Sequence, residues 1–303
     1  MTIATAWIGV DWGTTNMRLW AFDAAGTVLA ERQTGTGMAA LHPASYEPAL
    51  LDAAADLLPA RRRTPVLVCG MAGARQGWRE APYAPVPGPP CGLPPVSVPA
   101  ADPRLDVRIL PGLCQAPPAA DVMRGEETQI AGLLARTPGF DGVACLPGTH
   151  TKWARLRAGR VEGFRTILTG ELFGLLASQS VLRHSIGPGW DGAAHAAALA
   201  TALAAPERVP GALFALRAES LLAGLDPAAA RARLSGLLIG ADLAAAADIW
   251  RGQPVAVIGA EPLAGLYAAA LAQQDTAVRR EDVGALTRAG LTAAYETLSG
   301  AEA

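Results

Sequence analysis

The stretch IGVDWGTTNMRLW, residues 8–20, decides how the chain folds. Its first half is apolar and β-branched and stops at Gly13, which predicts a buried strand that ends in a glycine turn. The alternating residues 17–22 predict a second strand, and a turn at 23–26 leads to a third strand over 27–32. The chain therefore opens with a strand, a Gly-Thr turn, a strand, a turn and a strand.

A second segment repeats this plan further along the chain. LPGTHTKW, residues 146–153, places another Gly-Thr turn after an apolar strand predicted over 143–146. Two more strand-like segments follow it and are again separated by a glycine-containing turn. Such an internal repeat predicts two domains that are built on the same unit.

Composition and charge exclude several classes of protein. The chain has 303 residues, enough for two domains, and 51% of them are hydrophobic, which is too apolar for a disordered chain. The formal net charge of −2 provides no basic surface for nucleic acid or an anionic membrane. No apolar run is long enough to span a bilayer, and the N-terminal residues lack a secretory signal pattern. We therefore expect a cytoplasmic protein that binds neither nucleic acid nor a membrane.

The two glycine turns are suited to binding phosphate. Glycine lets a ligand approach the backbone closely, and neighbouring hydroxyl groups add donors to the N–H groups of the turn. The residues that we expect to bind phosphate are Gly13, Thr14, Thr15 and Asn16 in the first turn and Gly148, Thr149, His150 and Lys152 in the second. Asp11, at the end of the first strand, is placed to hold a Mg²⁺ ion through water.

Lys152 is the single lysine of the chain, although lysine and arginine together number 25. Coding bias explains the excess of arginine. Lys152 nevertheless lies on the predicted strand that leaves the second Gly-Thr turn, where a compact ammonium group is well placed for a phosphate. An ordinary strand residue whose side chain points away from the turn is the alternative.

These motifs resemble those of a known family. The Asp-Trp-Gly-Thr-Thr-Asn segment, the second Gly-Thr turn and a turn at Gly259 resemble the phosphate 1, phosphate 2 and adenosine motifs of the sugar kinase, hsp70 and actin superfamily. Nearly the whole chain is similar to the 2-dehydro-3-deoxygalactonokinase family. The segments that carry the similarity are IGVDWGTTNMRLW (8–20), GMAGARQGWREAPY (70–83), LPGLC (110–114), VMRGEETQIAG (122–132), LPGTHTKW (146–153), FRTILTGELFGLL (164–176) and LSGLLIGAD (234–242).

The resemblance implies an α/β fold of two ribonuclease-H-like domains with an interdomain ATP cleft, as in actin and hexokinase. We expect a first domain over 1–138 and 284–303, with the last helix returning to it, and a second domain over 139–283. Residues 82–103 contain nine prolines, so we expect a loop wrapped on the first domain there.

The resemblance also implies a reaction. The γ-phosphoryl group of ATP, with Mg²⁺, would be transferred to the C6 hydroxyl of 2-dehydro-3-deoxy-D-galactonate in galactonate catabolism. The expected partners are therefore ATP and a small sugar acid, and the sequence leaves the oligomeric state open.

This reaction needs a group that accepts the proton of the attacking hydroxyl. In the related glycerol and xylulose kinases a Gly-Asp pair supplies this base, and Gly125 and Glu126 stand at the corresponding place. Glu126 is therefore the first candidate, with Glu127 and Asp11 as alternatives. Both glutamates also open a predicted helix over 126–136, where negative charge is favoured by the helix dipole irrespective of catalysis.

The sugar acid is an anion, and a guanidinium group binds a carboxylate through two parallel hydrogen bonds. The candidates for binding the sugar acid are Arg75, Gln76, Trp78 and Arg124, together with Arg18 and Arg165 nearer the phosphate turns. A core position for Trp78 and a solvated surface position for any of the arginines are the alternatives.

Two rival functions fit the same fold. A kinase for another sugar or sugar acid would carry the same phosphate turns, and only substrate assays separate it from the first reading. A nucleotide-switched chaperone or activator ATPase would need a peptide-binding domain or a cluster ligand. The four cysteines are widely spaced, which does not favour a cluster.

Overall fold

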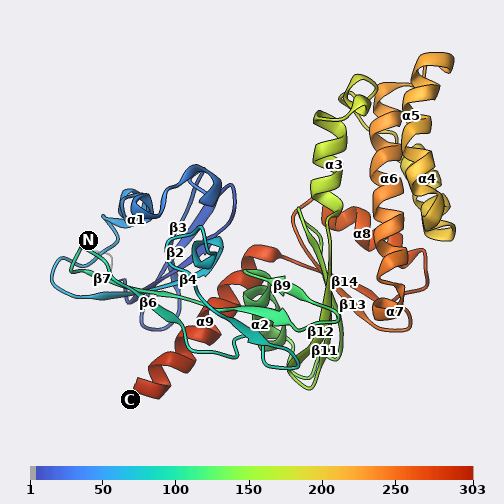
Figure 1. The fold of residues 1–303 in the computed structure, drawn as a ribbon. Helices are drawn as coiled ribbons and strands as arrows, with labels where there is room; N and C mark the ends of the chain where they lie inside the picture. The colour runs from blue at the N-terminus through green and yellow to red at the C-terminus, as the bar shows by residue number, and fades with distance from the viewer. Residues whose placement is uncertain (1–4, 303) are drawn as a thin grey trace. The chain divides into compact units, whose positions relative to one another are not determined.

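The computed structural model describes residues 5–302, and their side chains as far as residue 300. Two compact units make up the chain (Figure 1). Unit 1 holds residues up to 141, the segment 156–163 and the residues from 282 onward. Unit 2 holds residues 142–155 and 164–281. Residues 1–4 and 303, which we assigned to the first domain, lie outside the described residues.

The strands form two large sheets and one small one. The strands up to residue 123 are β1 (Trp7–Trp12), β2 (Met17–Phe22), β3 (Val28–Thr34), β4 (Thr64–Gly70), β5 (Tyr83–Pro85), β6 (Val96–Val98), β7 (Leu105–Ile109), β8 (Gly112–Gln115) and β9 (Asp121–Met123). The later strands are β10 (Gly142–Leu146), β11 (Thr151–Arg157), β12 (Arg160–Ile167), β13 (Val255–Ile258) and β14 (Val278–Glu281). The large sheets have the orders β3-β2-β1-β4-β7-β6 and β12-β11-β10-β13-β14, and the small one is β5-β8-β9.

The predicted internal repeat is confirmed by this strand order. In each large sheet the first strand lies beside the second on one side and beside a later strand on the other. β1 pairs in parallel with β4, and β4 with β7. In the same way β10 pairs in parallel with β13, and β13 with β14. Gly13 and Gly148 therefore follow equivalent strands of two equivalent sheets.

The helices divide between the units. They are α1 (Tyr46–Ala54), α2 (Glu126–Arg136), α3 (Thr169–Ser178), α4 (Gly192–Ala204), α5 (Val209–Ala223), α6 (Pro227–Ala245), α7 (Ala247–Trp250), α8 (Leu263–Ala272) and α9 (Val283–Glu302). Helices α1, α2 and α9 belong to unit 1, and the others belong to unit 2. Short 3₁₀ turns occur at Met38–Ala40, Pro43–Ser45, Met71–Gly73, Val181–His184 and Pro206–Arg208. Within the described part of the chain, no helix has the length and apolar character that crossing a membrane requires.

Each large sheet buries apolar residues against its helices. In unit 1, Leu50 and its neighbours in α1 pack on one side of the sheet, and Leu291 of α9 packs with Trp7 and Phe22 on the other. In unit 2, β10 and β13 are buried with residues of α6, α7 and α8. Helices α3, α4, α5 and α6 run beside one another and share a second apolar cluster (Figure 1).

Two predictions about local structure need correction. No strand was predicted over 278–281, yet VRRE forms β14 at the edge of the second sheet. Its charged residues carry no apolar signal, and the strand forms because β13 offers a parallel partner. The proline-rich segment 82–103 is mostly loop as expected, but β5 and β6 interrupt it. Both are three-residue strands at sheet edges, where proline is tolerated.

Helices α2 and α9 approach so closely that only glycine fits between them. A Cβ on Gly132 of α2 would overlap the carbonyl oxygen of Leu286, and a Cβ on Gly290 of α9 would overlap that of Thr128. Both obstacles are backbone atoms of the facing helix, so no side-chain rotation relieves the overlap. This contact is what fixes α9, the last helix of the chain, to unit 1.

We predict that Gly132→Ala destabilises the protein by about 2 kcal/mol, because α9 must shift away from α2 to make room for the methyl group. Thermal and urea unfolding would measure the loss. The control is Gly300→Ala, since Gly300 lies in the facing helix α9 but has open space around it. This control should be neutral or slightly stabilising. Equal stabilities for the two variants would contradict the close contact.

Candidate functional site

The first Gly-Thr turn is tied down by a neighbouring segment. The amides of Gly37, Met38 and Ala39 donate to the carbonyl groups of Thr15, Gly13 and Thr14 at 2.9–3.0 Å. Gly37 must be glycine there, because a Cβ would overlap the backbone of the turn. The carbonyl groups of the turn are thus occupied, and the side chains of Thr14, Thr15 and Asn16 are exposed to solvent.

Gly70, at the end of β4, brings the carboxylate candidates of unit 1 together. A Cβ on Gly70 would lie 3.5 Å from Oδ1 of Asp11. A Cβ on Gly125, just before α2, would lie 3.3 Å from the Cα of Gly70. Asp11 and the start of α2, where Glu126 and Glu127 lie, therefore flank the same glycine. Both glycines have positive φ angles, +87° for Gly70 and +102° for Gly125, a backbone conformation that favours glycine.

The two carboxylate oxygens of Asp11 have different neighbours. Its Oδ2 accepts a hydrogen bond from Arg18 at 2.6 Å. Its Oδ1 faces the buried thiol of Cys69 at 3.9 Å. No group of three or more His, Cys, Asp or Glu side chains within the described residues forms a metal site. A single carboxylate fits a Mg²⁺ ion held through water and phosphate oxygens, and it does not fit an all-protein metal cage.

The two adjacent glutamates occupy different environments. Glu126 is half-buried, and its carboxylate accepts a hydrogen bond from the amide of Arg124 at 3.1 Å. Glu127 is fully buried and accepts a hydrogen bond from the amide of Gly125 at 2.7 Å. Burial, and next the nearby charge of Glu126, raise the pKa of Glu127 to about 8. Glu127 is therefore mostly protonated at neutral pH.

The sugar-acid candidates of unit 1 differ in accessibility. Arg75 is exposed and lies 3.5 Å from Glu80, and Gln76 is exposed beside it. Trp78 is half-buried and packs edge-on against Trp12, with ring centroids 5.9 Å apart. These three residues follow the 3₁₀ turn Met71–Gly73 in a loop that begins at the end of β4.

The guanidinium group of Arg124 is buried against this loop. It is only 8% exposed, donates to the carbonyl of Ala81 at 2.7 Å and lies 4.3 Å above the ring of Tyr83. Among the described residues, its Nε and Nη1 atoms have no hydrogen-bond partner. A Cβ on Gly73 would lie 2.7 Å from Nη1, so the loop packs directly on the guanidinium group.

The second Gly-Thr turn, in unit 2, is held by the start of α3. The amide of Glu171 donates to the carbonyl of Thr149 at 2.9 Å, and the Glu171 carboxylate lies 2.5 Å from Nε2 of His150. Gly170 packs so closely on the turn that a Cβ would overlap the carbonyl oxygen of Gly148. The buried Lys152 donates to the carbonyl of His150 at 3.2 Å, so its ammonium group belongs to the turn.

Gly259 lies directly beside this turn. Because β10 and β13 are parallel neighbours, the residues that follow them meet at one edge of the sheet. A Cβ on Gly259 would lie 3.3 Å from the carbonyl oxygen of Pro147. The second phosphate turn and the predicted adenosine turn therefore lie together in unit 2.

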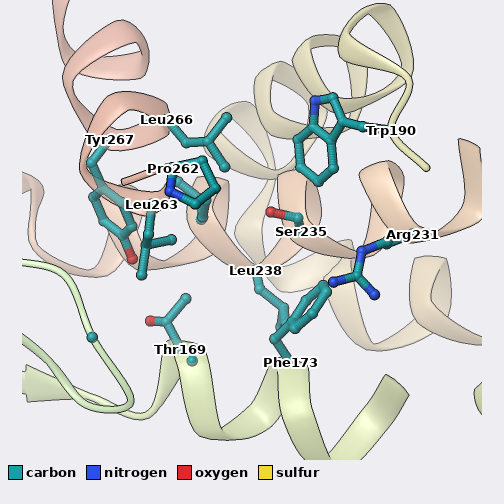
Figure 2. Close-up of a pocket in the computed structure, with 13 residues that line it drawn as sticks. Thr169, Phe173, Trp190, Arg231, Ser235, Leu238, Pro262, Leu263, Leu266 and Tyr267 are labelled. Atoms are coloured by element: carbon teal, nitrogen blue, oxygen red, sulfur yellow. The ribbon is translucent and has the colours of Figure 1, made fainter. Parts of the chain in front are cut away.

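A pocket of about 490 Å³ opens from Gly148 and is lined by unit 2 alone. Figure 2 shows Pro262, Leu263, Leu266 and Tyr267 on one side and residues of α6, with Trp190, on the other. The full lining comprises Gly148, Thr169, Gly170, Phe173, Trp190, Arg231, Ser235, Leu238, Ile239, Pro262, Leu263, Leu266 and Tyr267. The walls are thus mainly apolar and aromatic, with Ser235 and Arg231 as polar groups.

Sequence reasoning did not find most of this pocket. Phe173, Trp190, Arg231 and Ser235 come from the two helices α3 and α6 and from a loop, and no single motif contains them. Trp190 carries the clearest local signal, because it directly follows the loop residues Gly187 and Gly189 in the sequence. Arg165, in contrast, is bound to Asp248 at 2.6 Å in unit 2, and the other sugar-acid candidates lie in unit 1.

We predict that Glu127→Gln changes how stability depends on pH. Between 4.5, the ordinary pKa, and about 8, the folded protein keeps a proton on Glu127 that the unfolded chain releases. Raising the pH through this window therefore lowers the stability of the wild type, by up to about 1.4 kcal/mol per pH unit for this one group. Glutamine cannot ionise, so the stability of the variant relative to the wild type should rise as the pH goes from 5 to 8.

Urea unfolding at several pH values measures this difference. The control is Glu219→Gln, because hydrogen bonds from Arg233 lower the pKa of Glu219 and place its titration below this window. The difference in unfolding free energy between the control and the wild type should therefore be constant from pH 5 to pH 8. Parallel curves for Glu127→Gln and the wild type would show that Glu127 is ionised throughout.

Comparison with known proteins agrees with this arrangement. A sequence profile of the family described as 2-keto-3-deoxy-galactonokinase matches residues 11–294. A relative from Rhizobium meliloti (strain 1021), named provisionally as a 2-dehydro-3-deoxygalactonokinase, is 41% identical over 304 residues, covering 98% of this chain and 99% of that protein. The 2-dehydro-3-deoxygalactonokinase of Escherichia coli (strain K12) is 35% identical over 244 residues, which is 80% of each chain.

A crystal structure gives the same result for the fold. A protein from Sinorhizobium meliloti, also named provisionally as a 2-dehydro-3-deoxygalactonokinase, superposes with a TM-score of 0.89 at 40% identity. The superposition covers 96% of this chain and 99% of that one. The expected α/β fold of the actin and hexokinase type is confirmed, and so is the resemblance on which it was based. The chain belongs to the 2-keto-3-deoxy-galactonokinase family.

Proposed function

We propose that this protein phosphorylates 2-dehydro-3-deoxy-D-galactonate at its C6 hydroxyl with ATP, and that it acts in the cytoplasm. The observation that carries this proposal is the pocket of unit 2, which runs from the second Gly-Thr turn to the helix after Gly259. The identity of the substrate is inferred from the relatives that are named as 2-dehydro-3-deoxygalactonokinases. The alternative of a nucleotide-switched chaperone or activator is not favoured, because these relatives are named as kinases.

The pocket suits the adenosine part of ATP. Its volume of about 490 Å³ is in the usual range for small-ligand sites. The flat faces of Trp190 and Phe173 favour stacking on a base, and Ser235 offers a hydrogen bond to a base edge. Because Gly148 lines the pocket, a base bound there would place its phosphates toward the second Gly-Thr turn, where Thr149 and Lys152 are our predicted phosphate ligands. The first Gly-Thr turn, residues 13–16 of unit 1, stays a predicted phosphate-binding site in addition to this one.

Glu126 is the proposed acceptor of the substrate proton. Glu127 is buried and mostly protonated at neutral pH, so it is poorly suited to take up a further proton. Asp11 is ion-paired with Arg18, and we assign it to Mg²⁺ through water, where the ion would neutralise phosphoryl charge. Glu126, in contrast to the fully buried Glu127, is partly accessible at the start of α2, where a substrate hydroxyl could reach it.

The sugar-acid carboxylate is proposed to bind at the loop after β4. Arg75 and Gln76 are exposed there, and Trp78 offers an aromatic face beside them. Arg124 supports the same loop from below through its bond to Ala81. Arg18 and Arg165 each hold a carboxylate of the protein, which leaves them less available for the substrate.

We predict that Glu126→Gln lowers kcat about 10²–10⁴-fold, the usual contribution of a positioned general base. Glutamine keeps the size of the side chain and an oxygen for the amide of Arg124, but it cannot accept the proton. The control is Glu127→Gln, which should stay within a few-fold of wild-type kcat. A large loss for Glu127→Gln with full activity for Glu126→Gln would reverse the assignment.

We predict that a panel of sugars and sugar acids will place 2-dehydro-3-deoxy-D-galactonate among the best substrates. Coupled detection of ADP measures the initial rates at equal substrate concentrations. Sugars that lack the carboxylate should react at least about 100-fold more slowly, because they cannot form the charged hydrogen bonds proposed with Arg75. A sugar kinase of another specificity is shown instead if a neutral sugar gives the highest kcat/KM.

A further inference from the structure

A buried carboxylate in α6 joins three elements around the pocket without lining it. Asp242 is only 1% exposed. Its Oδ1 accepts a hydrogen bond from Nε1 of Trp153 at 2.7 Å. Its Oδ2 accepts from the hydroxyl of Tyr267 at 2.5 Å and also from that of Thr169. We call these four residues the Asp242 cluster.

Each donor belongs to a different part of the proposed ATP site. Trp153 lies on β11, the strand that leaves the second Gly-Thr turn, and Thr169 is the first residue of α3. Tyr267 lies on α8, the helix that follows Gly259. The Tyr267 hydroxyl also lies 3.1 Å from that of Thr151, which joins the network to the turn a second time.

The donors connect Asp242 to the pocket and to the second Gly-Thr turn. Thr169 and Tyr267 both line the pocket. The two residues after Thr169 hold the turn, since Gly170 packs on Gly148 and the amide of Glu171 donates to Thr149 at 2.9 Å. A displacement of α3 would therefore move the turn and the pocket wall together.

Stability alone gives little reason for a carboxylate at this place. All three donors are neutral, so the buried charge is compensated by hydrogen bonds without a cation. Burial raises the pKa of Asp242, and the bonds from Thr169, Tyr267 and Trp153 oppose that shift. A well-packed apolar residue commonly stabilises a core as well as a buried charge does. What an apolar residue lacks is the ability to hold three donors in one fixed geometry.

We propose that Asp242 is a positioning residue for ATP, which holds the second Gly-Thr turn, the start of α3 and the wall of α8 in one arrangement. The inference rests on the proposed function, because it takes the pocket of unit 2 as the ATP site. Asp242 acts through Thr169, Tyr267 and Trp153 and does not itself line the pocket.

The test is Asp242→Asn, measured as KM for ATP, KM for the sugar acid and kcat. Asparagine keeps one acceptor oxygen and replaces the other with a donor, so one side of the cluster loses its acceptor. We expect KM for ATP to rise by about 10–100-fold, as is usual for lost hydrogen bonds to a charged group. KM for the sugar acid should stay within about twofold. The matched control is Glu219→Gln in α5, which removes another hydrogen-bonded carboxylate of unit 2 and should leave all three constants unchanged.

A purely structural role predicts a different pattern. It would lower the melting temperature, and activity would fall only in proportion to the unfolded fraction, with KM for ATP unchanged. That result overturns the proposal, as does wild-type KM for ATP and kcat in Asp242→Asn.

Two milder variants keep the proposal testable if Asp242→Asn does not fold. Thr169→Val and Tyr267→Phe each remove one donor and should raise KM for ATP about 3–10-fold. In a double-mutant cycle, the effects of Thr169→Val and Tyr267→Phe on KM for ATP should be less than additive, because both hydroxyl groups donate to the same oxygen of Asp242. Full additivity, or no change in either single variant, overturns the proposal.

A separate variant distinguishes failure of this inference from failure of the proposed ATP site. Trp190 lines the pocket but is not a donor to Asp242. Trp190→Ala should weaken binding of a non-hydrolysable ATP analogue about tenfold if the base stacks there. Unchanged binding by Trp190→Ala refutes the pocket as the ATP site and the inference with it. Weakened binding together with an unaffected Asp242→Asn refutes the inference alone.

Discussion

The parallel pairing of a central strand with a later strand is the constraint on which the site depends. In unit 1 it sets Trp12 opposite Gly70, and in unit 2 it sets Cys145 opposite Val257. Parallel neighbours end at the same edge of a sheet, so the segments that follow them are forced together although they are far apart in sequence. Asp11, Gly70 and Gly125 meet for this reason in one unit, and Gly148 and Gly259 in the other. Glycine is needed at Gly70 because a Cβ there would overlap the carbonyl oxygen of Trp12.

Local sequence patterns predicted the elements that hold these turns. The first strands of both sheets and their glycine turns follow from short apolar runs, and helix α2 begins and ends where the acidic first turn and the residues Thr137 and Pro138 indicate. The edge strand β14 was missed, because VRRE has no apolar pattern of its own and depends on β13. Arg124 stays a predicted ligand for the sugar acid, and its place in the sequence could not show that its guanidinium group is buried. The pocket and the Asp242 cluster were also out of reach, since Trp153, Thr169 and Tyr267 approach Asp242 from separate elements.

Glu126 and Glu127 show how two neighbouring residues of one type acquire different chemistry. Consecutive residues on a helix point in different directions, so one carboxyl group of the pair is buried and the other is partly solvated. The charge of Glu126 is then one reason why Glu127 keeps its proton, and burial is the larger one. A protonated Glu127 in turn leaves a single negative charge at the start of α2 at neutral pH, which the N-terminal end of a helix stabilises. The sequence shows both glutamates, but it does not show which of the two carboxyl groups is buried.

The glycine contact between α2 and α9 also bears on the order in which the protein is made. Unit 1 begins at the N-terminal end, yet one face of its sheet is covered by Leu291 and Ala294 of α9. All of unit 2 is synthesised before those residues leave the ribosome. Unit 2 is therefore the first part whose core can close completely during translation, while the tryptophan-rich face of the first sheet stays uncovered. The longer the segment between α2 and α9, the longer this apolar face of the first sheet waits during translation for the helix that covers it.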